Sequence, residues 1–222
     1  MIKKNVLYIG NFIFPNGNAS GLRVLGNGYL LRSIGHEVYF VGMKEGGDFS
    51  LSTEKKTYDK FNYYEIGRPN GIKDWLSYGH VLDSVKDLIE QLDIDVIITY
   101  GSPTLTTFVR SLQKWAKKNS IILYTDCVDW LPSNNGNLIH RAIKWVDDSY
   151  QKRVVNLKGN GVIVISSYLR KYYEERGCRI VTIPPLVNSK SLKLRLNDTK
   201  NNKLEKTKLV YVGIPFALDG RI

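Results

Sequence analysis

Two kinds of hydrophobic pattern alternate along the chain. Short continuous apolar runs predict buried strands, and longer stretches with apolar residues every three or four positions predict amphipathic helices. Alternation of these elements is typical of an α/β fold, here a Rossmann-like parallel sheet with helices on both faces. The predicted strands are Asn5–Ile9, Glu37–Val41, Tyr63–Ile66, Asp95–Thr99, Ile121–Tyr124, Gly161–Ile165 and Ile180–Ile183.

The predicted helices lie between these strands. The first covers Leu22–Ile34 and ends at Gly35, because glycine adopts the left-handed conformation common at helix ends. Ser166 or Ser167 caps the last helix. The polar segment Lys44–Lys60 predicts a loop. Three further helices carry apolar stripes that we interpret as core: Leu82, Val85, Leu88, Ile89 and Leu92; Leu105, Phe108, Val109, Leu112 and Ala116; and Ile139, Ala142, Ile143, Val146, Tyr150 and Val154.

The composition is that of an ordinary folded protein. Of 222 residues, 43% are hydrophobic and 24% are charged, and no apolar run is long enough to span a membrane. The apolar part of the N-terminus, Val6–Ile9, is too short for a secretory signal. Two cysteines, Cys127 and Cys178, do not form a disulfide framework. We therefore expect a cytoplasmic, reduced protein.

The net charge of +11 admits nucleic acid, an anionic membrane surface or an anionic substrate as partner. Much of the excess is local, because Lys190–Lys208 holds seven basic and two acidic residues in an Asn-rich context typical of a linker. No basic stripe is interleaved with aromatic residues, so we expect no nucleic-acid binding. We divide the chain into a Rossmann-like domain at 1–189, a basic linker at 190–208, and a strand and glycine loop at 209–222 that begin a second, truncated domain.

The loop after the first predicted strand is the first candidate site. Gly17, Asn18, Ser20 and Gly21 lie where a helix begins, small residues let a ligand approach the backbone, and helix N-termini favour anionic groups. Arg23 adds a cation in the first turn. The alternative is a long surface loop. Neither a G-x-G-x-x-G fingerprint nor a phosphate-binding G-x-x-x-x-G-K-[ST] loop is present.

The carboxyl ends of two further strands carry polar residues at the same predicted edge of the sheet, where ligands bind in open parallel sheets. Asp126 and Asp129 follow the fifth predicted strand and either bind sugar hydroxyls or are solvated and cap a turn. Tyr100 and Ser102 follow the fourth, where Ser102 or Thr104 is expected to cap the next helix. No cluster of His, Cys and carboxylate with metal-ligand spacing exists, so no metal is expected.

Together these passages resemble the N-terminal half of GT-B glycosyltransferases, especially the retaining family 4. The resemblance rests on four features in order along the chain: the glycine loop after the first strand, "LLRSIGHEVYFV", "YTDCVDWLP", and "VIVISSYLRKYYEERG" followed by "VTIPPLVN". Asp126 stands where many members carry a histidine that contacts the donor sugar. Leu131 takes the place of the tryptophan in the D-x-W-P-like passage, and Trp130 is one position early.

The resemblance implies an acceptor-binding domain followed by the start of a donor-binding domain, whose loop at Gly213 would meet the donor phosphates. It implies transfer of a sugar from a nucleotide sugar to an acceptor hydroxyl with retention, in glycan or glycolipid synthesis, and without a metal cofactor. Asp126 is the catalytic candidate, and the acceptor is a glycan or a lipid-linked sugar. Contact with the anionic inner membrane face suits the positive charge. The alternative is a non-catalytic remnant or a sugar-binding Rossmann-like domain.

Overall fold

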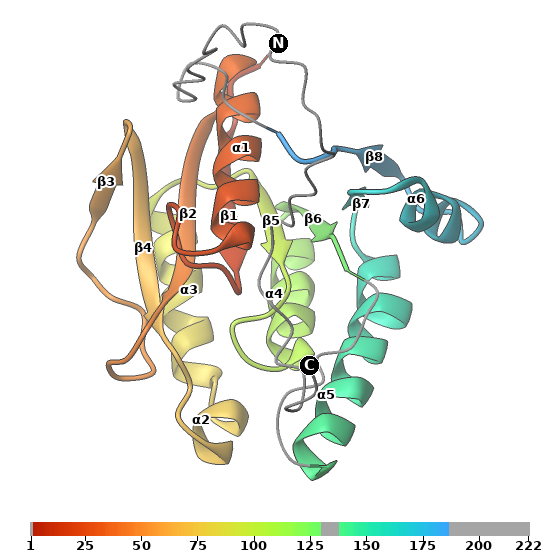
Figure 1. Cartoon of the computed structure of the whole chain (residues 1–222). Helices are drawn as coiled ribbons and strands as arrows, with labels where there is room; N and C mark the ends of the chain where they lie inside the picture. The colour runs from red at the N-terminus through yellow and green to blue at the C-terminus, as the bar shows by residue number, and fades with distance from the viewer. Residues whose placement is uncertain (1, 130–137, 187–222) are drawn as a thin grey trace, which may run out of the picture. The chain divides into compact units, whose positions relative to one another are not determined.

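The central feature of the fold is a single open sheet (Figure 1). The computed structural model describes residues 2–129 and 138–186. Within these residues the sheet order is β3-β4-β2-β1-β5-β6-β7-β8, and every neighbouring pair is parallel except β3 and β4. The strands are β1 (Asn5–Gly10), β2 (Glu37–Lys44), β3 (Lys56–Tyr58), β4 (Phe61–Gly67), β5 (Val96–Tyr100), β6 (Ile122–Cys127), β7 (Gly161–Val164) and β8 (Ile180–Thr182).

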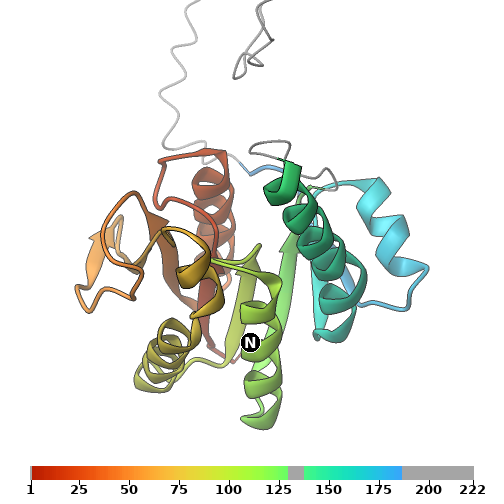
Figure 2. The same ribbon diagram turned by 90° about the horizontal axis from the view of Figure 1, so that it is seen from below.

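Helices cover both faces of the sheet, as Figure 2 shows along the sheet edge. The helical elements are α1 (Ala19–Ser33), α2 (Ile72–Leu76), α3 (Gly79–Gln91), α4 (Thr106–Lys118), α5 (Leu138–Tyr150), a π-helical turn (Gln151–Val155), a 3₁₀ turn (Asn156–Lys158) and α6 (Ser167–Glu174). Side chains of β1 alternate between the two layers. Leu7 and Ile9 pack with α3 and α4, whereas Val6 and Tyr8 pack with α1.

The predicted α/β fold with a parallel sheet is confirmed, and all seven predicted strands are present. The loop prediction for Lys44–Lys60 was wrong in part, because Lys56–Tyr58 forms the short edge strand β3 and pairs antiparallel with β4. The helix α2 was not predicted; it spans only five residues. The fifth predicted strand also continues to Cys127, which places Asp126 inside the strand and not after it.

The helix ends test three predicted capping residues. Gly35 has φ +97° after α1 and Ser166 caps α6 by accepting from the Leu169 amide, so both predictions are confirmed. The cap of α4 was predicted wrongly. Ser102 Oγ donates to the Leu105 carbonyl, while the free Thr106 amide donates to the Asp147 carboxylate of α5 at 2.9 Å. A residue far along the chain therefore caps α4.

Several expectations concern residues outside those described. They are the basic linker at 190–208, the second-domain start at 209–222 with Gly213, and the residues Trp130, Leu131 and Pro132. These expectations stay predictions. Among the described helices, none combines the length and the apolar character that crossing a bilayer requires.

Candidate functional site

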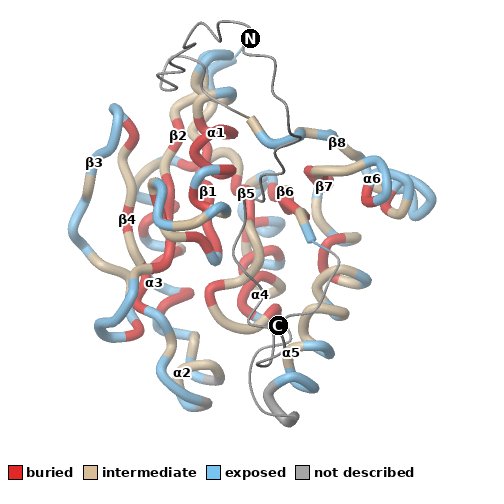
Figure 3. The backbone as a smooth tube through the Cα atoms, in the orientation of Figure 1, coloured by how far each residue is buried: buried red, intermediate tan, exposed pale blue. Residues whose placement is uncertain are grey.

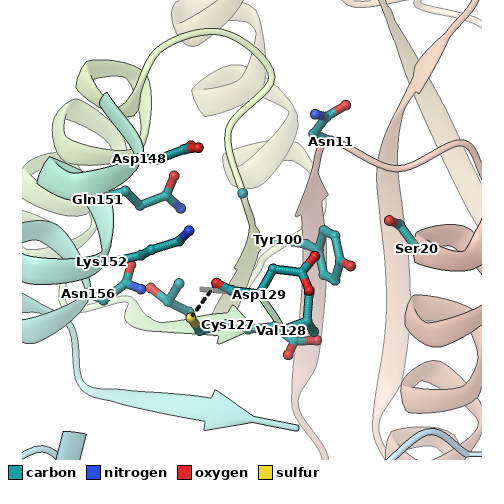
Figure 4. Close-up of a pocket in the computed structure, with 13 residues that line it drawn as sticks. Asn11, Ser20, Tyr100, Cys127, Val128, Asp129, Asp148, Gln151, Lys152 and Asn156 are labelled. Atoms are coloured by element: carbon teal, nitrogen blue, oxygen red, sulfur yellow. Dashed lines mark hydrogen bonds between the residues drawn. The ribbon is translucent and has the colours of Figure 1, made fainter. Parts of the chain in front are cut away.

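A cavity of about 360 Å³ opens at the carboxyl ends of β1, β5 and β6 (Figure 4). Asn11 follows β1, Tyr100 and Gly101 lie at the end of β5, and Asp129 follows β6. A second cavity of about 300 Å³ shares Asn11 and Gly101 with the first, together with two residues of the α5 region. The two cavities thus form one continuous cleft along the edge where open parallel sheets bind ligands.

The opposite wall of the cleft comes from α5 and the π-helical turn that follows it. Asp148, Gln151, Lys152 and Asn156 line the first cavity, and Figure 4 shows the ends of Gln151 and Lys152 directed into it. A π turn adds a residue to the helical repeat and often marks a functional site. Tyr173 fixes this turn, because its hydroxyl donates to the Lys152 carbonyl at 3.2 Å and accepts from Asn156 Nδ2 at 2.9 Å.

Asn156 leaves one polar atom unpaired in this wall. Its side chain is 2% exposed, and its Oδ1 has no hydrogen-bond partner among the described residues. A buried amide oxygen without a partner is costly unless a donor reaches it. Asn156 as a residue lines the first cavity, but its unpaired Oδ1 is itself buried.

Beneath the cleft, Arg23 and Asp126 form a buried ion pair. Arg23 donates to both carboxylate oxygens of Asp126, from Nε at 3.1 Å and from Nη2 at 2.7 Å. Its Nη1 donates to the Ile183 carbonyl at 3.0 Å. The side chains are 7% and 0% exposed, respectively. This forked geometry satisfies a buried carboxylate and joins α1 to β6 and to the end of β8.

Two further donors complete the surroundings of Asp126. The Tyr8 hydroxyl donates to Asp126 Oδ2, and Asn27 Nδ2 donates to the same oxygen at 3.2 Å. Burial first, and then the charge of Asp126, raise the pKa of Tyr8 well above its usual value. Burial lowers the pKa of Arg23, but the hydrogen bonds and charge of Asp126 raise it more, so its net pKa lies above the usual value. Tyr8 thus stays a neutral donor and Arg23 a cation.

This arrangement corrects the expectations for Asp126 and Arg23. Asp126 lies inside β6 and is among the residues that line the first cavity, but it is not solvated, because donors of the chain itself enclose its carboxylate on the α1 side. Arg23 donates to atoms of the chain itself, so it is not the ligand-binding cation expected in the first turn. The pair thus forms part of the floor of the cleft with its charges neutralised by each other.

The other predicted residues are distributed around the cleft. Ser20, Tyr100 and Asp129 line the first cavity and Ser102 lines the second, so the structure brings these four together at one sheet edge. Asp129 is exposed, unlike Asp126. Burial is the main cause that raises the pKa of Tyr100, which keeps this hydroxyl protonated as a donor.

The glycine loop has a structural reason that the sequence analysis did not give. A Cβ on Gly21 would lie 2.2 Å from the Ile13 carbonyl oxygen, and one on Gly17 would lie 2.4 Å from the Ile13 side chain. These glycines therefore let the loop approach itself, and neither lines the described cleft. Asn18 is the N-cap of α1, where its side chain accepts from the Gly21 amide at 2.8 Å.

Sequence reasoning missed the wall formed by Asp148, Gln151, Lys152 and Asn156. The helix was assigned from its apolar stripe, and its polar residues were not considered. Gln151 and Lys152 lie three and four positions after Asp148, which was the available signal. The π turn that brings Asn156 to the same cavity has no signature in the sequence.

The α5 wall of the cleft carries the carboxylate of Asp148 together with the donors Gln151 and Lys152, and Asp129 lies opposite them. Asp129 and Asp148 accept hydrogen bonds, whereas Gln151 and Lys152 donate them. Such a mixture suits a ligand with many hydroxyl groups, each of which donates and accepts. The described residues contain no group of three or more His, Cys, Asp or Glu side chains placed to hold a metal ion. A larger cavity, about 740 Å³, lies between β2, β4 and α3, away from this edge.

Solved structures share this fold. The catalytic domain of starch synthase IV from Arabidopsis thaliana, bound to ADP and acarbose, matches 83% of this chain and 52% of its own at 14% identity and a TM-score of 0.53. Sucrose-phosphate synthase from Thermosynechococcus elongatus matches 82% of this chain and 48% of its own at 11% identity and a TM-score of 0.60. No protein-family model and no curated protein sequence matches the chain.

These likenesses confirm the fold that the sequence resemblance implies. The chain has the Rossmann-like architecture of one half of a GT-B glycosyltransferase, and it spans about half the length of the two structures. Identities of 11% and 14% establish the fold and leave the chemistry to the site itself.

Proposed function

We propose that the chain is the acceptor-binding half of a glycosyltransferase, which moves a sugar from a nucleotide sugar to an acceptor hydroxyl. The observation that carries this proposal is the polar cleft at the carboxyl ends of β1, β5 and β6, in a fold shared with two glycosyltransferases. The acceptor is a glycan or a lipid-linked sugar, used in glycan or glycolipid synthesis. The donor is bound by a second domain.

The cleft supplies the groups that hold and orient such an acceptor. Asp129 and Asp148 accept from acceptor hydroxyls, and Gln151 and Lys152 donate to its oxygens. Orienting the attacking hydroxyl toward the donor carbon replaces a bimolecular encounter with a positioned one, which accounts for much of the rate in such reactions. The buried Arg23–Asp126 pair keeps the strand ends in place.

In this proposal the anomeric configuration of the sugar is retained and no metal cofactor takes part, both as implied by the family resemblance. The leaving diphosphate is then stabilised by helix N-termini and basic groups. Closure around both substrates excludes water and favours transfer over hydrolysis. Asp126 acts by positioning the floor of the cleft, since its carboxylate is enclosed by four donor atoms.

The test is transfer by the product of the entire coding sequence. It is incubated with UDP-, GDP- and ADP-sugars and with a panel of oligosaccharides and lipid-linked sugars, and the released nucleoside diphosphate and glycosylated product are measured. The configuration of the new bond is read by NMR. Lys152→Ala is expected to raise KM for the acceptor about tenfold, since a hydrogen bond to a charged group is lost. Lys114→Ala, an exposed lysine of α4 outside the cleft, is the control.

Release of diphosphate with no product other than free sugar would restrict the activity to hydrolysis and contradict the proposal. Saturable sugar binding in the cleft without turnover of any donor would support the alternative of a non-catalytic sugar-binding domain.

A further inference from the structure

Helix α5 carries its apolar side chains on the wrong side for a core helix. Four of its large apolar residues are well exposed: Ile143 at 44%, Trp145 at 57%, Val146 at 60% and Tyr150 at 38%. Figure 3 shows α5 as exposed and intermediate along its course, while α4 carries a buried stripe. The interpretation of the 139–154 stripe as core was therefore wrong for Ile143, Val146 and Tyr150.

The polar side of α5 faces inward instead. Asp147 caps α4 through the Thr106 amide and hydroxyl, and Lys144, Asp148 and Gln151 line the cleft. The helix is thus amphipathic, but its polar face contacts the rest of the protein and its apolar face is exposed, the opposite of the usual arrangement. A single exposed apolar residue is ordinary, but a helix face with an exposed tryptophan, tyrosine, isoleucine and valine needs a partner.

The charges on this helix indicate which partner. Between residues 138 and 155 the only acidic residues are Asp147 and Asp148, and both are turned inward. Arg153 is exposed at the C-terminal end of the apolar face. The outer face, which we define as Ile143, Trp145, Val146, Tyr150 and Arg153, thus combines apolar and aromatic side chains with a cation and contains no acidic residue.

We propose that the outer face of α5 is a docking surface for an anionic lipid bilayer. Interfacial amphipathic helices bury an apolar face at the level of the headgroups, with tryptophan and tyrosine at the boundary and arginine near the phosphates. Each cation near an anionic surface adds attraction that salt screens. The net charge of +11 has the matching sign.

This docking gives α5 two functions on opposite sides. Its outer face contacts the bilayer, and its inner face forms one wall of the cleft. The bilayer and the cleft then lie on opposite sides of α5. The head group of an acceptor anchored in the same bilayer can therefore reach Asp148 and Gln151 by extending past this one helix. The specific use by a lipid-linked acceptor rests on the proposed function, whereas the docking itself does not.

The test is co-sedimentation of the protein, without any sugar, with vesicles of phosphatidylglycerol mixed with phosphatidylcholine, and with vesicles of phosphatidylcholine alone. Val146→Glu should weaken binding to the anionic vesicles about tenfold or more, because it removes apolar burial and adds repulsion. Trp145→Ala should weaken it less. Leu22→Glu is the matched control: Leu22 is 55% exposed on α1, which covers the sheet face opposite to α4.

The outcomes separate the possible occupants of this face. Binding that needs the anionic lipid, falls with salt and is lost only in the α5 variants supports the proposal. Equal binding of wild type, Val146→Glu and Leu22→Glu would overturn it, as would no binding of the wild type at low salt. A dimer in solution that Val146→Glu converts to monomer, with vesicle binding unchanged, would assign the face to a second copy of the chain and also overturn it. None of these results depends on transfer activity.

Discussion

The Arg23–Asp126 pair shows how one buried charge fixes the surroundings of the cleft. Removing a carboxylate from water is costly, and the cost is offset only if the remaining hydrogen-bonding capacity is filled. Asp126 meets this condition with bonds from Arg23, Tyr8 and Asn27. The sequence predicted a carboxylate at this sheet edge but ended the strand at Tyr124, whereas β6 continues to Cys127, so Asp126 has a fixed side-chain direction within the strand.

Arg23→Met is expected to lower the free energy of unfolding by about 3–5 kcal/mol, because it leaves the Asp126 carboxylate buried without its cation. The double variant Arg23→Met/Asp126→Leu should be more stable than Arg23→Met alone, since no charge remains buried. Urea unfolding of the two variants and the wild type measures both differences. A double variant that is less stable than Arg23→Met would contradict the pairing of the two charges.

The neighbouring residues Asp147 and Asp148 have different roles: Asp147 stabilises the fold and Asp148 lines the cleft. Asp147→Ala removes the cap of α4 and should cost about 1–2 kcal/mol of unfolding free energy. Asp148→Ala touches only the cleft and should change stability by less than about 0.5 kcal/mol. Thermal and urea unfolding of the pair tests this assignment. An equal loss in both variants would contradict the capping role of Asp147 seen in the structure.

At the scale of elements, the sequence predicted what depends on local pattern and missed what depends on tertiary contacts. Continuous apolar runs located the strands, because parallel strands are covered on both faces. The stripe of α5 could not reveal its direction, since periodicity shows that a helix has two faces and not which one is buried. The cap of α4 was unpredictable for a similar reason: Asp147 lies 41 residues from Thr106.

The start of α1 depends on a close backbone contact at Gly21. Gly21→Ala should lower the unfolding free energy by about 1–3 kcal/mol, because the new Cβ would overlap the Ile13 carbonyl 2.2 Å away. Gly79→Ala in the first turn of α3 is the control. No atom lies within 4 Å of its added Cβ, so it should be neutral or stabilising by about 0.5 kcal/mol. Urea unfolding decides, and equal effects would exclude the contact as the reason for glycine.

The start of β1 is tied to β5 by Asp95, which accepts from Lys4 Nζ at 2.7 Å and from the Asn5 amide at 2.8 Å. The hydrogen bond from Lys4, with that from Asn5, lowers the pKa of Asp95. The ionised Asp95 therefore contributes its full stabilisation of the folded state above the pKa that an aspartate has in the unfolded chain, about 3.9. This contribution is lost as the pH falls through the lower pKa that Asp95 has in the folded state.

Asp95→Asn should thus cost about 0.5–1 kcal/mol of unfolding free energy at neutral pH, a small value because the pair is partly exposed. The difference from wild type should shrink as the pH falls below 4. Urea unfolding at a series of pH values measures it, with Asp87→Asn, exposed on α3, as control. A difference that stays constant down to the lowest pH would show that the charge of Asp95 does not contribute.

At the scale of the whole molecule, the open sheet places its chemistry at one edge. Asn11, Tyr100 and Asp129 come from three separate strand ends, and the parallel topology alone brings them together. Tyr100 and Asp129 were predicted at this edge from the sequence, whereas Asn11 was not. The α5 wall was not predicted either, because it requires a helix whose polar face is turned to the protein. Both parts are needed to enclose a cleft that offers hydrogen-bond donors and acceptors together.

The central claim is that this cleft binds a sugar acceptor. The most direct measurement is an NMR titration of the isotope-labelled protein with oligosaccharides, following the backbone amides. The account predicts saturable shifts confined to the cleft, at Asn11, Gly101, Gln151, Lys152 and their neighbours, that weaken about tenfold in Lys152→Ala. Shifts that gather instead around Tyr39, Tyr64 and α3, or that do not change in Lys152→Ala, would contradict it.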